Sequence, residues 1–111
     1  MAKHDPTLDT LFAALSDPTR RAMLNRLMQG PASVSDLAQP FDMALPTILQ
    51  HLTKLEAGGL ISTRKEGRTR VCTANPAALA QAADWLADQR AMWEARLDRL
   101  EAFLDGKDTK T

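Results

Sequence analysis

The spacing of the apolar residues changes at Gly58-Gly59, and this change constrains the fold more than any other feature of the chain. Before these glycines, apolar residues recur every three or four positions, as they do in amphipathic helices. After them, the segment "LISTRKEGRTRVCTA" alternates roughly between apolar and polar residues and is rich in Thr, Val and Ile. We therefore predict a mainly helical fold that contains one small β-hairpin.

Two helices are predicted in the first thirty residues. One covers residues 8–16 and has Thr7 as a candidate cap. The next covers residues 18–29; it starts with a proline, and either Ser16 or Asp17 can cap it. Its inward side is predicted to consist of Ala22, Met23, Leu27 and Met28.

Two further helices follow, and a short turn joins them. The third helix is short and is capped by Ser33 or Ser35, and the fourth covers residues 44–57. Ala44 provides no capping side chain, so Asp42 is a candidate to start the fourth helix earlier. Two helices joined in this way, the second with a polar outer face, form a helix-turn-helix pattern.

One face of the fourth helix is polar and has no acid, although the whole chain has 14 acids and 14 bases. Helical spacing places Ile48, Leu52 and Leu55 on the inner face. The opposite face is predicted to present Thr47, Gln50, His51 and Lys54. An α-helix fits the major groove of B-DNA, where Gln can pair with adenine and His or Lys can meet guanine acceptors. This face therefore predicts DNA binding, and an ordinary solvated helix is the alternative.

The hairpin after the fourth helix is predicted to pair Leu60–Lys65 with Thr69–Ala74 around Glu66-Gly67. Residues 54–70 carry five bases against two acids, so the basic excess is local. Long cations in a hairpin suit phosphates or the minor groove. A helix-turn-helix followed by a basic wing, residues 60–74, predicts a winged helix-turn-helix that binds double-stranded DNA.

Leu45 and Leu49 lie at the edge of the polar face of the fourth helix. Apolar side chains there could contact thymine methyl groups, which would favour an A·T-leaning operator. They could also suit a protein partner, in which case the chain is a winged-helix interaction module. Ordinary packing at the helix edge is the third interpretation.

Three motifs, "DPTRR", "HLTKLEAGGLI" and "KEGRTRV", resemble the ArsR family of bacterial winged-helix repressors, and the resemblance covers about residues 8–80. It implies a homodimer that binds a near-palindromic operator and represses by blocking transcription. The chain departs from the family at Ala44, Leu45 and Leu49, where members commonly carry Ser or Gln. The resemblance and the basic faces together give the predicted DNA contacts: Ser33, Ser35, Pro46, Thr47, Leu49, Gln50, His51, Lys54, Arg64, Lys65, Arg68 and Arg70.

No metal site and no cofactor are predicted. Metal-sensing relatives carry a Cys-x-Cys pair where this chain has Ser33, Val34 and Ser35, and the final helix has no histidine. The single cysteine, Cys72, excludes an intrachain disulfide and is interpreted as a small apolar strand residue. The alternative is a redox-responsive repressor that senses oxidation of Cys72, and an unidentified small-molecule effector also stays open.

A long final helix begins after Asn75-Pro76 and carries Leu79, Leu86, Trp93 and Leu100 seven residues apart. This spacing indicates a helix–helix seam, and packing against the protein's own helices is the alternative. The segment "ADWLADQRAMWEARLDRLEAFL" also resembles the branch of the family that has no known metal site. The predicted dimer contacts are Leu8, Leu11, Phe12, Leu86, Trp93, Leu97 and Leu100.

The chain is predicted to form one domain, residues 1–105, with a disordered tail at 106–111. No catalytic residues are predicted, because no nucleophile with a base and no Gly-rich phosphate loop is found. The first ten residues lack the apolar core of a signal peptide, and no apolar run reaches about 20 residues. These features predict a soluble, cytoplasmic protein with no membrane partner.

Overall fold

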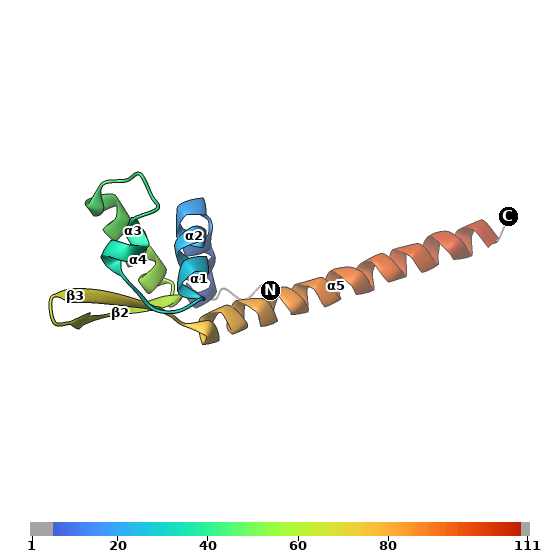
Figure 1. Cartoon of the computed structure of the whole chain (residues 1–111). Helices are drawn as coiled ribbons and strands as arrows, with labels where there is room; N and C mark the ends of the chain where they lie inside the picture. The colour runs from blue at the N-terminus through green and yellow to red at the C-terminus, as the bar shows by residue number, and fades with distance from the viewer. Residues whose placement is uncertain (1–5, 110–111) are drawn as a thin grey trace. The chain divides into compact units, whose positions relative to one another are not determined.

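The computed structural model describes residues 6–109, and side chains within residues 7–106. The chain divides into two compact units, Met1–Leu79 and Ala80–Thr111, which are described separately. The first unit is a winged helix-turn-helix, so the predicted fold is confirmed (Figure 1). None of the described helices is both long enough and apolar enough to cross a membrane.

Four helices precede the wing in the order that the periodicity predicts. They are α1 (Pro6–Leu15), α2 (Pro18–Leu27), α3 (Val34–Ala38) and α4 (Leu45–Ala57). Thr7 lies inside α1, so its prediction as a cap is wrong. Asp17 caps α2 and Ser33 caps α3, because their side chains accept hydrogen bonds from the backbone N–H groups of Arg20 and Asp36.

The sheet has three strands rather than the two of the predicted hairpin. The strands β2 (Ile61–Glu66) and β3 (Thr69–Ala74) pair antiparallel, and β1 (Ala32–Ser33) pairs with the other edge of β3. β1 has only two residues, which is too short to show an alternating pattern in the sequence. It ties the start of α3 to the wing, because Ser33 lies opposite Val71 in the register.

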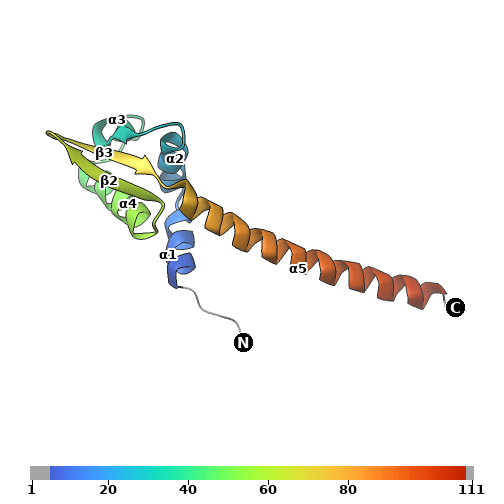
Figure 2. The ribbon, with the colours of Figure 1, turned by 90° about the horizontal axis from the view of Figure 1, so that it is seen from below.

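The wing closes through a two-residue turn at Gly67-Arg68, between the paired residues Glu66 and Thr69. Gly67 has φ +62, a left-handed conformation that glycine adopts without the steric cost of a side chain. A glycine at the first central position of a two-residue turn is typical of tight hairpins, whose twist it matches. The hairpin extends well past the helices in both views of the ribbon (Figures 1 and 2).

The core of the first unit forms where α4 packs against α1, α2 and β2, and where α2 and α3 pack against β3. On α2, however, the predicted inward residues Ala22 and Met28 are exposed, and Leu24 is buried in their place. The buried side of α2 consists of Arg20, Met23, Leu24 and Leu27, so it is rotated relative to the predicted stripe. The largest fully buried side chains are Leu11, Met23, Leu37, Ile48, Leu55, Leu60 and Cys72.

The C-terminal end of α1 is held by two arginines of α2. Arg20 donates from Nε to the carbonyl of Ala14 at 2.7 Å, and Arg21 donates from Nη1 to the carbonyl of Leu15 at 2.7 Å. The last carbonyls of a helix have no intrahelical donor and carry partial negative charge, so two cations are well placed there. The motif "DPTRR" thus caps the start of one helix and the end of the other.

In the second unit, α5 (Pro76–Thr109) continues as a helix past Gly106, into the segment for which a disordered tail is predicted. Residues 110 and 111 lie outside the described part of the chain. Within this unit, Arg90 and Glu94 form an ion pair at 3.6 Å, and the Arg96 guanidinium lies 5.4 Å from the centre of the Trp93 ring. Large apolar side chains are exposed along the helix: Trp85, Leu86, Met92, Trp93, Leu97, Leu100, Phe103 and Leu104.

Candidate nucleic-acid interface

The outward side of α4 carries an open concave surface. It is lined by Pro46, Leu49, Gln50, Thr53 and Lys54, which we call the α4 face. These residues follow one another at spacings of three and four, so they share one side of the helix. None of the five is acidic, and all are exposed, which permits close approach to a polyanion.

Thr53 belongs to this face although the sequence analysis does not single it out. It lies four residues after Leu49, and its hydroxyl donates to the Leu49 carbonyl at 2.9 Å. Thr47 is exposed in the first turn of α4 but does not line the concave surface. Helical spacing from Leu49 could have identified Thr53, had the leucine been placed on the outer face rather than at its edge.

His51 is not on the α4 face, and its prediction as an outward-facing residue is wrong. Its side chain is 16% exposed, and its Nδ1 lies 3.2 Å from Nη1 of Arg20 and 3.8 Å from Oδ2 of Asp17. The reason lies in the helical period: position 51 is three residues after Ile48 and four before Leu55, both of which are buried. His51 therefore contacts the α1–α2 junction and is removed from the candidate DNA contacts.

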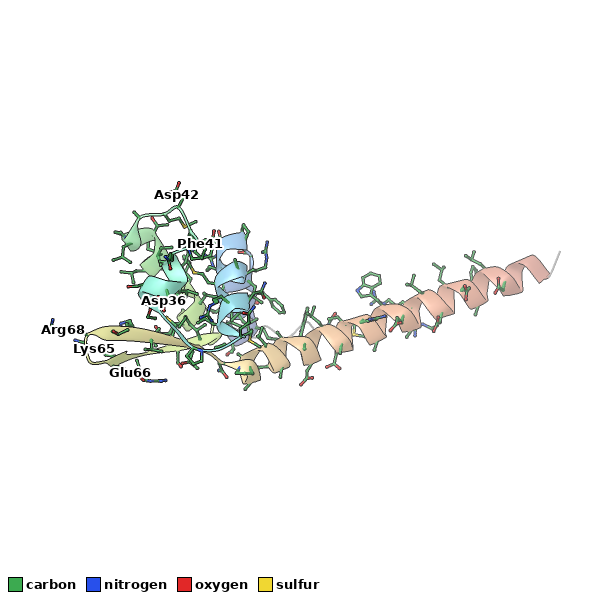
Figure 3. The ribbon with its side chains drawn as sticks, in the orientation of Figure 1. Asp36, Phe41, Asp42, Lys65, Glu66 and Arg68 are labelled. Atoms are coloured by element: carbon green, nitrogen blue, oxygen red, sulfur yellow. The ribbon has the colours of Figure 1, made fainter. Side chains whose placement is uncertain are left out.

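Ala44 occupies the N-cap position directly before α4 and forms no side-chain cap hydrogen bond. Asp42 does not replace the cap, because it lies in the loop before α4 and the helix begins only at Leu45 (Figure 3). That expectation is therefore wrong. Pro46 lies in the first turn, where the missing N–H has no intrahelical partner to lose.

The tip of the wing carries two outward cations, Lys65 and Arg68, at the outer end of the hairpin (Figure 3). Arg64 donates from Nε to Glu66, so part of its charge is neutralised within the wing. All four predicted wing cations are exposed. Arg64 is less available to an external anion than the others, because it is paired with Glu66.

Lys65 lies directly opposite Arg70 in the register of β2 and β3. Directly opposed residues point to the same side of an antiparallel pair, and like charges in this arrangement destabilise the hairpin. Arg70 also donates from Nη1 to the Thr63 hydroxyl at 3.0 Å, and that hydroxyl donates to Oε2 of Glu56 on α4 at 3.4 Å. These bonds hold the Arg70 side chain toward α4.

A second concave surface connects α3, α4 and the wing, with a volume of about 290 Å³. It is lined by Ser33, Val34, Ser35, Leu45, Leu49, Arg68, Thr69 and Arg70. Ser35 is exposed there, whereas the Ser33 hydroxyl already accepts the backbone N–H of Asp36 at 3.1 Å. Apart from His51, the predicted DNA contacts thus come from β1 and α3, from α4 and from the wing, and Leu49 lines both concave surfaces.

Cys72 lies on β3 at the centre of the sheet and is fully buried. Burial raises the pKa of its thiol, and the nearby Glu56 carboxylate raises it further. A protonated, inaccessible thiol reacts slowly, in keeping with its interpretation as a small apolar strand residue. Among the described residues, no group of three or more His, Cys, Asp or Glu side chains is arranged to hold a metal ion.

Comparisons with known proteins agree with this architecture. Residues 15–64 match the family model described as a helix-turn-helix domain. The transcriptional repressor SdpR of Bacillus subtilis is 32% identical over 79 residues, which span 71% of this chain and 88% of that protein. The HTH-type transcriptional regulator Rv2034 of Mycobacterium tuberculosis is 39% identical over 72 residues, 65% of this chain and 67% of that protein.

Two solved structures have the same fold. The crystal structure of an ArsR family transcriptional regulator has a TM-score of 0.76 at 50% identity, and the match covers 79% of this chain and 97% of that one. An ArsR-like transcriptional regulator from Rhodococcus sp. RHA1 has a TM-score of 0.77 at 35% identity, over 87% and 92% of the two chains. The chain belongs to the ArsR family of winged helix-turn-helix transcriptional repressors, DNA-binding regulators rather than a class of enzymes.

Proposed function

We propose that this protein is a homodimeric repressor that binds a near-palindromic operator through the α4 face and the wing. The observation that carries the proposal is the α4 face itself, a concave surface with no acid among its five lining residues. In the major groove, Gln50 can read adenine, and Lys54 can meet a guanine or a phosphate. Lys65, Arg68 and Arg70 on the wing supply phosphate or minor-groove contacts.

The charge arrangement of the wing supports a polyanionic partner. Lys65 and Arg70 face each other across the hairpin although like charges repel at that position. Binding a phosphate between or beside them would relieve this repulsion. The repulsion between the two cations is a cost in the isolated protein, and this cost favours an anionic partner over an ordinary solvated surface.

The dimer is supported by α5. Two copies of a winged helix bind half-sites that are about 34 Å apart, one turn of DNA, when a two-fold axis relates them. Four of the predicted dimer contacts, Leu86, Trp93, Leu97 and Leu100, are exposed on α5. Leu11 is only 1% exposed in the single chain, so we place it in the core and leave Leu8 and Phe12 as the α1 contacts.

The proposed repressor does not sense its signal through a thiolate-bound metal or through Cys72. Ser33 and Ser35 occupy the positions where a ligand pair would lie, and the single thiol is buried in the sheet. A small-molecule effector of another class is compatible with these residues.

The test is a fluorescence-anisotropy titration of operator DNA with alanine variants of Gln50, Lys54 and Arg68. Each variant should weaken binding, and loss of Lys54 or Arg68 should reduce the slope of log affinity against log salt by about one phosphate contact. Arg21→Ala removes a cation at the α1–α2 junction and serves as the matched control, with an unchanged slope. Unchanged affinity in all three variants would instead favour the interaction module.

A further inference from the structure

An exposed leucine lies at the centre of the proposed interface. Leu49 is 41% exposed, and it lines the α4 face, the surface between α3 and the wing, and a third hollow beside Thr63 and Arg70. It is the residue that these three concave surfaces share. A side chain in this position meets whatever occupies the interface.

The surroundings of Leu49 do not suit an apolar protein partner. Lys54 lies on one side of it, and Arg68 and Arg70 lie on the other. Among the described residues, the one acid that lines these three surfaces is Glu56, in the hollow beside Arg70. Burying Lys54 and Arg68 against an apolar surface would therefore cost free energy. The surroundings suit a partner with anionic edges and small apolar groups between them, and the major groove of DNA has phosphates along its rims and thymine methyl groups on its floor.

We propose that Leu49 contacts the C5-methyl group of a thymine in each half-site, so that the protein prefers thymine over an unmethylated pyrimidine at that position. This inference rests on the proposed function. Gln50 is the next residue along α4 and lines the same surface, and its amide is suited to adenine. Leu49 and Gln50 together would recognise adjacent A·T pairs, the methyl group through contact and the adenine through hydrogen bonds.

Leu45 is the matched comparison. It is more exposed than Leu49, at 55%, but it lines only the surface between α3 and the wing and not the α4 face. We therefore assign the methyl contact to Leu49. Leu45→Ser should leave the methyl dependence in place.

The experiment deletes the methyl group from the DNA rather than from the protein. In the operator captured by the full-length protein, each thymine of one half-site is replaced in turn by deoxyuridine, which has the same hydrogen-bonding edge without the methyl group. One replacement should weaken binding by about fourfold, because this is the fold-change that corresponds to burying one apolar carbon. Replacement in both half-sites should weaken binding by roughly 15-fold.

The same titrations with Leu49→Ser separate this contact from changes in DNA stiffness. The variant should bind thymine and deoxyuridine operators equally, whereas Leu45→Ser should still discriminate between them. An equal uridine penalty in wild type and Leu49→Ser, or no penalty at any thymine, overturns the inference and leaves operator binding intact. Failure of the wild-type protein to bind any captured DNA overturns the proposed function as well, so the two failures are distinct.

Discussion

The Nδ1 atom of His51 lies 3.2 Å from Nη1 of Arg20, which joins α4 to the end of α1 through one buried guanidinium. Arg20 is 9% exposed, and it also donates to the carbonyls of Ala13 and Ala14. The guanidinium therefore joins three helices. It connects α4 to the α1–α2 junction through His51, and it lines a hollow with Lys54 of the α4 face.

Replacing Arg20 by methionine should destabilise the fold by about 2–4 kcal/mol, because buried acceptors lose their donors while the apolar stem is kept. Arg21→Met is the control, since Arg21 is exposed and makes a single bond to Leu15; its cost should stay below about 1 kcal/mol. Urea unfolding followed by circular dichroism measures both. Equal unfolding midpoints for the two variants would show that the guanidinium does not join the helices as described.

Asp17 predicts how the stability of this junction depends on pH. A hydrogen bond from the Arg20 backbone N–H lowers the pKa of Asp17 below 3.8, and the charges of His51 and Arg20 lower it further. A lowered pKa in the folded state means that the stabilisation is present above about pH 4 and is lost as the pH falls through the folded value. Asp17→Asn keeps a capping side chain but not the charge, so the difference in unfolding midpoint from wild type should shrink between about pH 5 and pH 3. A difference that does not change with pH would contradict this assignment.

Gly58, the residue that caps the C-terminus of α4, lies close to α1. A Cβ at this position would lie 3.1 Å from Cβ of Ala14, 3.2 Å from the Thr10 carbonyl oxygen and 3.3 Å from Cα of Leu11. Two of these atoms belong to the backbone and cannot move aside easily, so Gly58→Ala should destabilise by about 1–3 kcal/mol. Gly106→Ala on α5 meets nothing within 4 Å and should be neutral or stabilising by up to about 1 kcal/mol. Thermal melting of the two variants checks the contrast, and a neutral Gly58→Ala would mean that the helices can separate freely.

Cys72 should react with a thiol reagent only when the sheet opens. Its thiol is fully buried and its pKa is raised, so labelling of the native protein should be far slower than labelling in urea. Peroxide should leave operator binding unchanged in wild type and in Cys72→Ala alike. Rapid labelling without urea, or loss of binding on oxidation of wild type alone, would support the redox-responsive alternative.

The apolar side of α5 should hold the dimer. Leu97→Arg places a cation on the exposed stripe that includes Trp93 and Leu100, and it should shift the protein to a monomer in light scattering. Ala95→Arg adds the same residue on the other side of the same helix and should leave the mass unchanged. If both variants were monomers, or if both were dimers, the dimer contact would lie elsewhere.

Most of the fold follows from the sequence because helical periodicity and caps such as Asp17 act locally. The errors arise where the local pattern is ambiguous. β1 is defined only by its pairing with β3, a long-range contact that no local pattern records. Polarity alone predicts an outward His51 and an edge position for Leu49, whereas the spacing from the buried Ile48 and Leu55 predicts the reverse for the histidine. That spacing puts the histidine inward and the leucine outward. The candidate DNA site therefore loses His51, and Leu49 becomes part of the α4 face.

The central claim is that α4 and the wing of two copies bind one near-palindromic operator. Sequencing genomic DNA fragments captured by the purified full-length protein tests it most directly. The captured fragments should share two inverted half-sites about one helical turn apart, roughly 34 Å between centres, each with A·T pairs where Leu49 and Gln50 meet the groove. Fragments with no shared motif, or with a single half-site and no inverted partner, would contradict the claim.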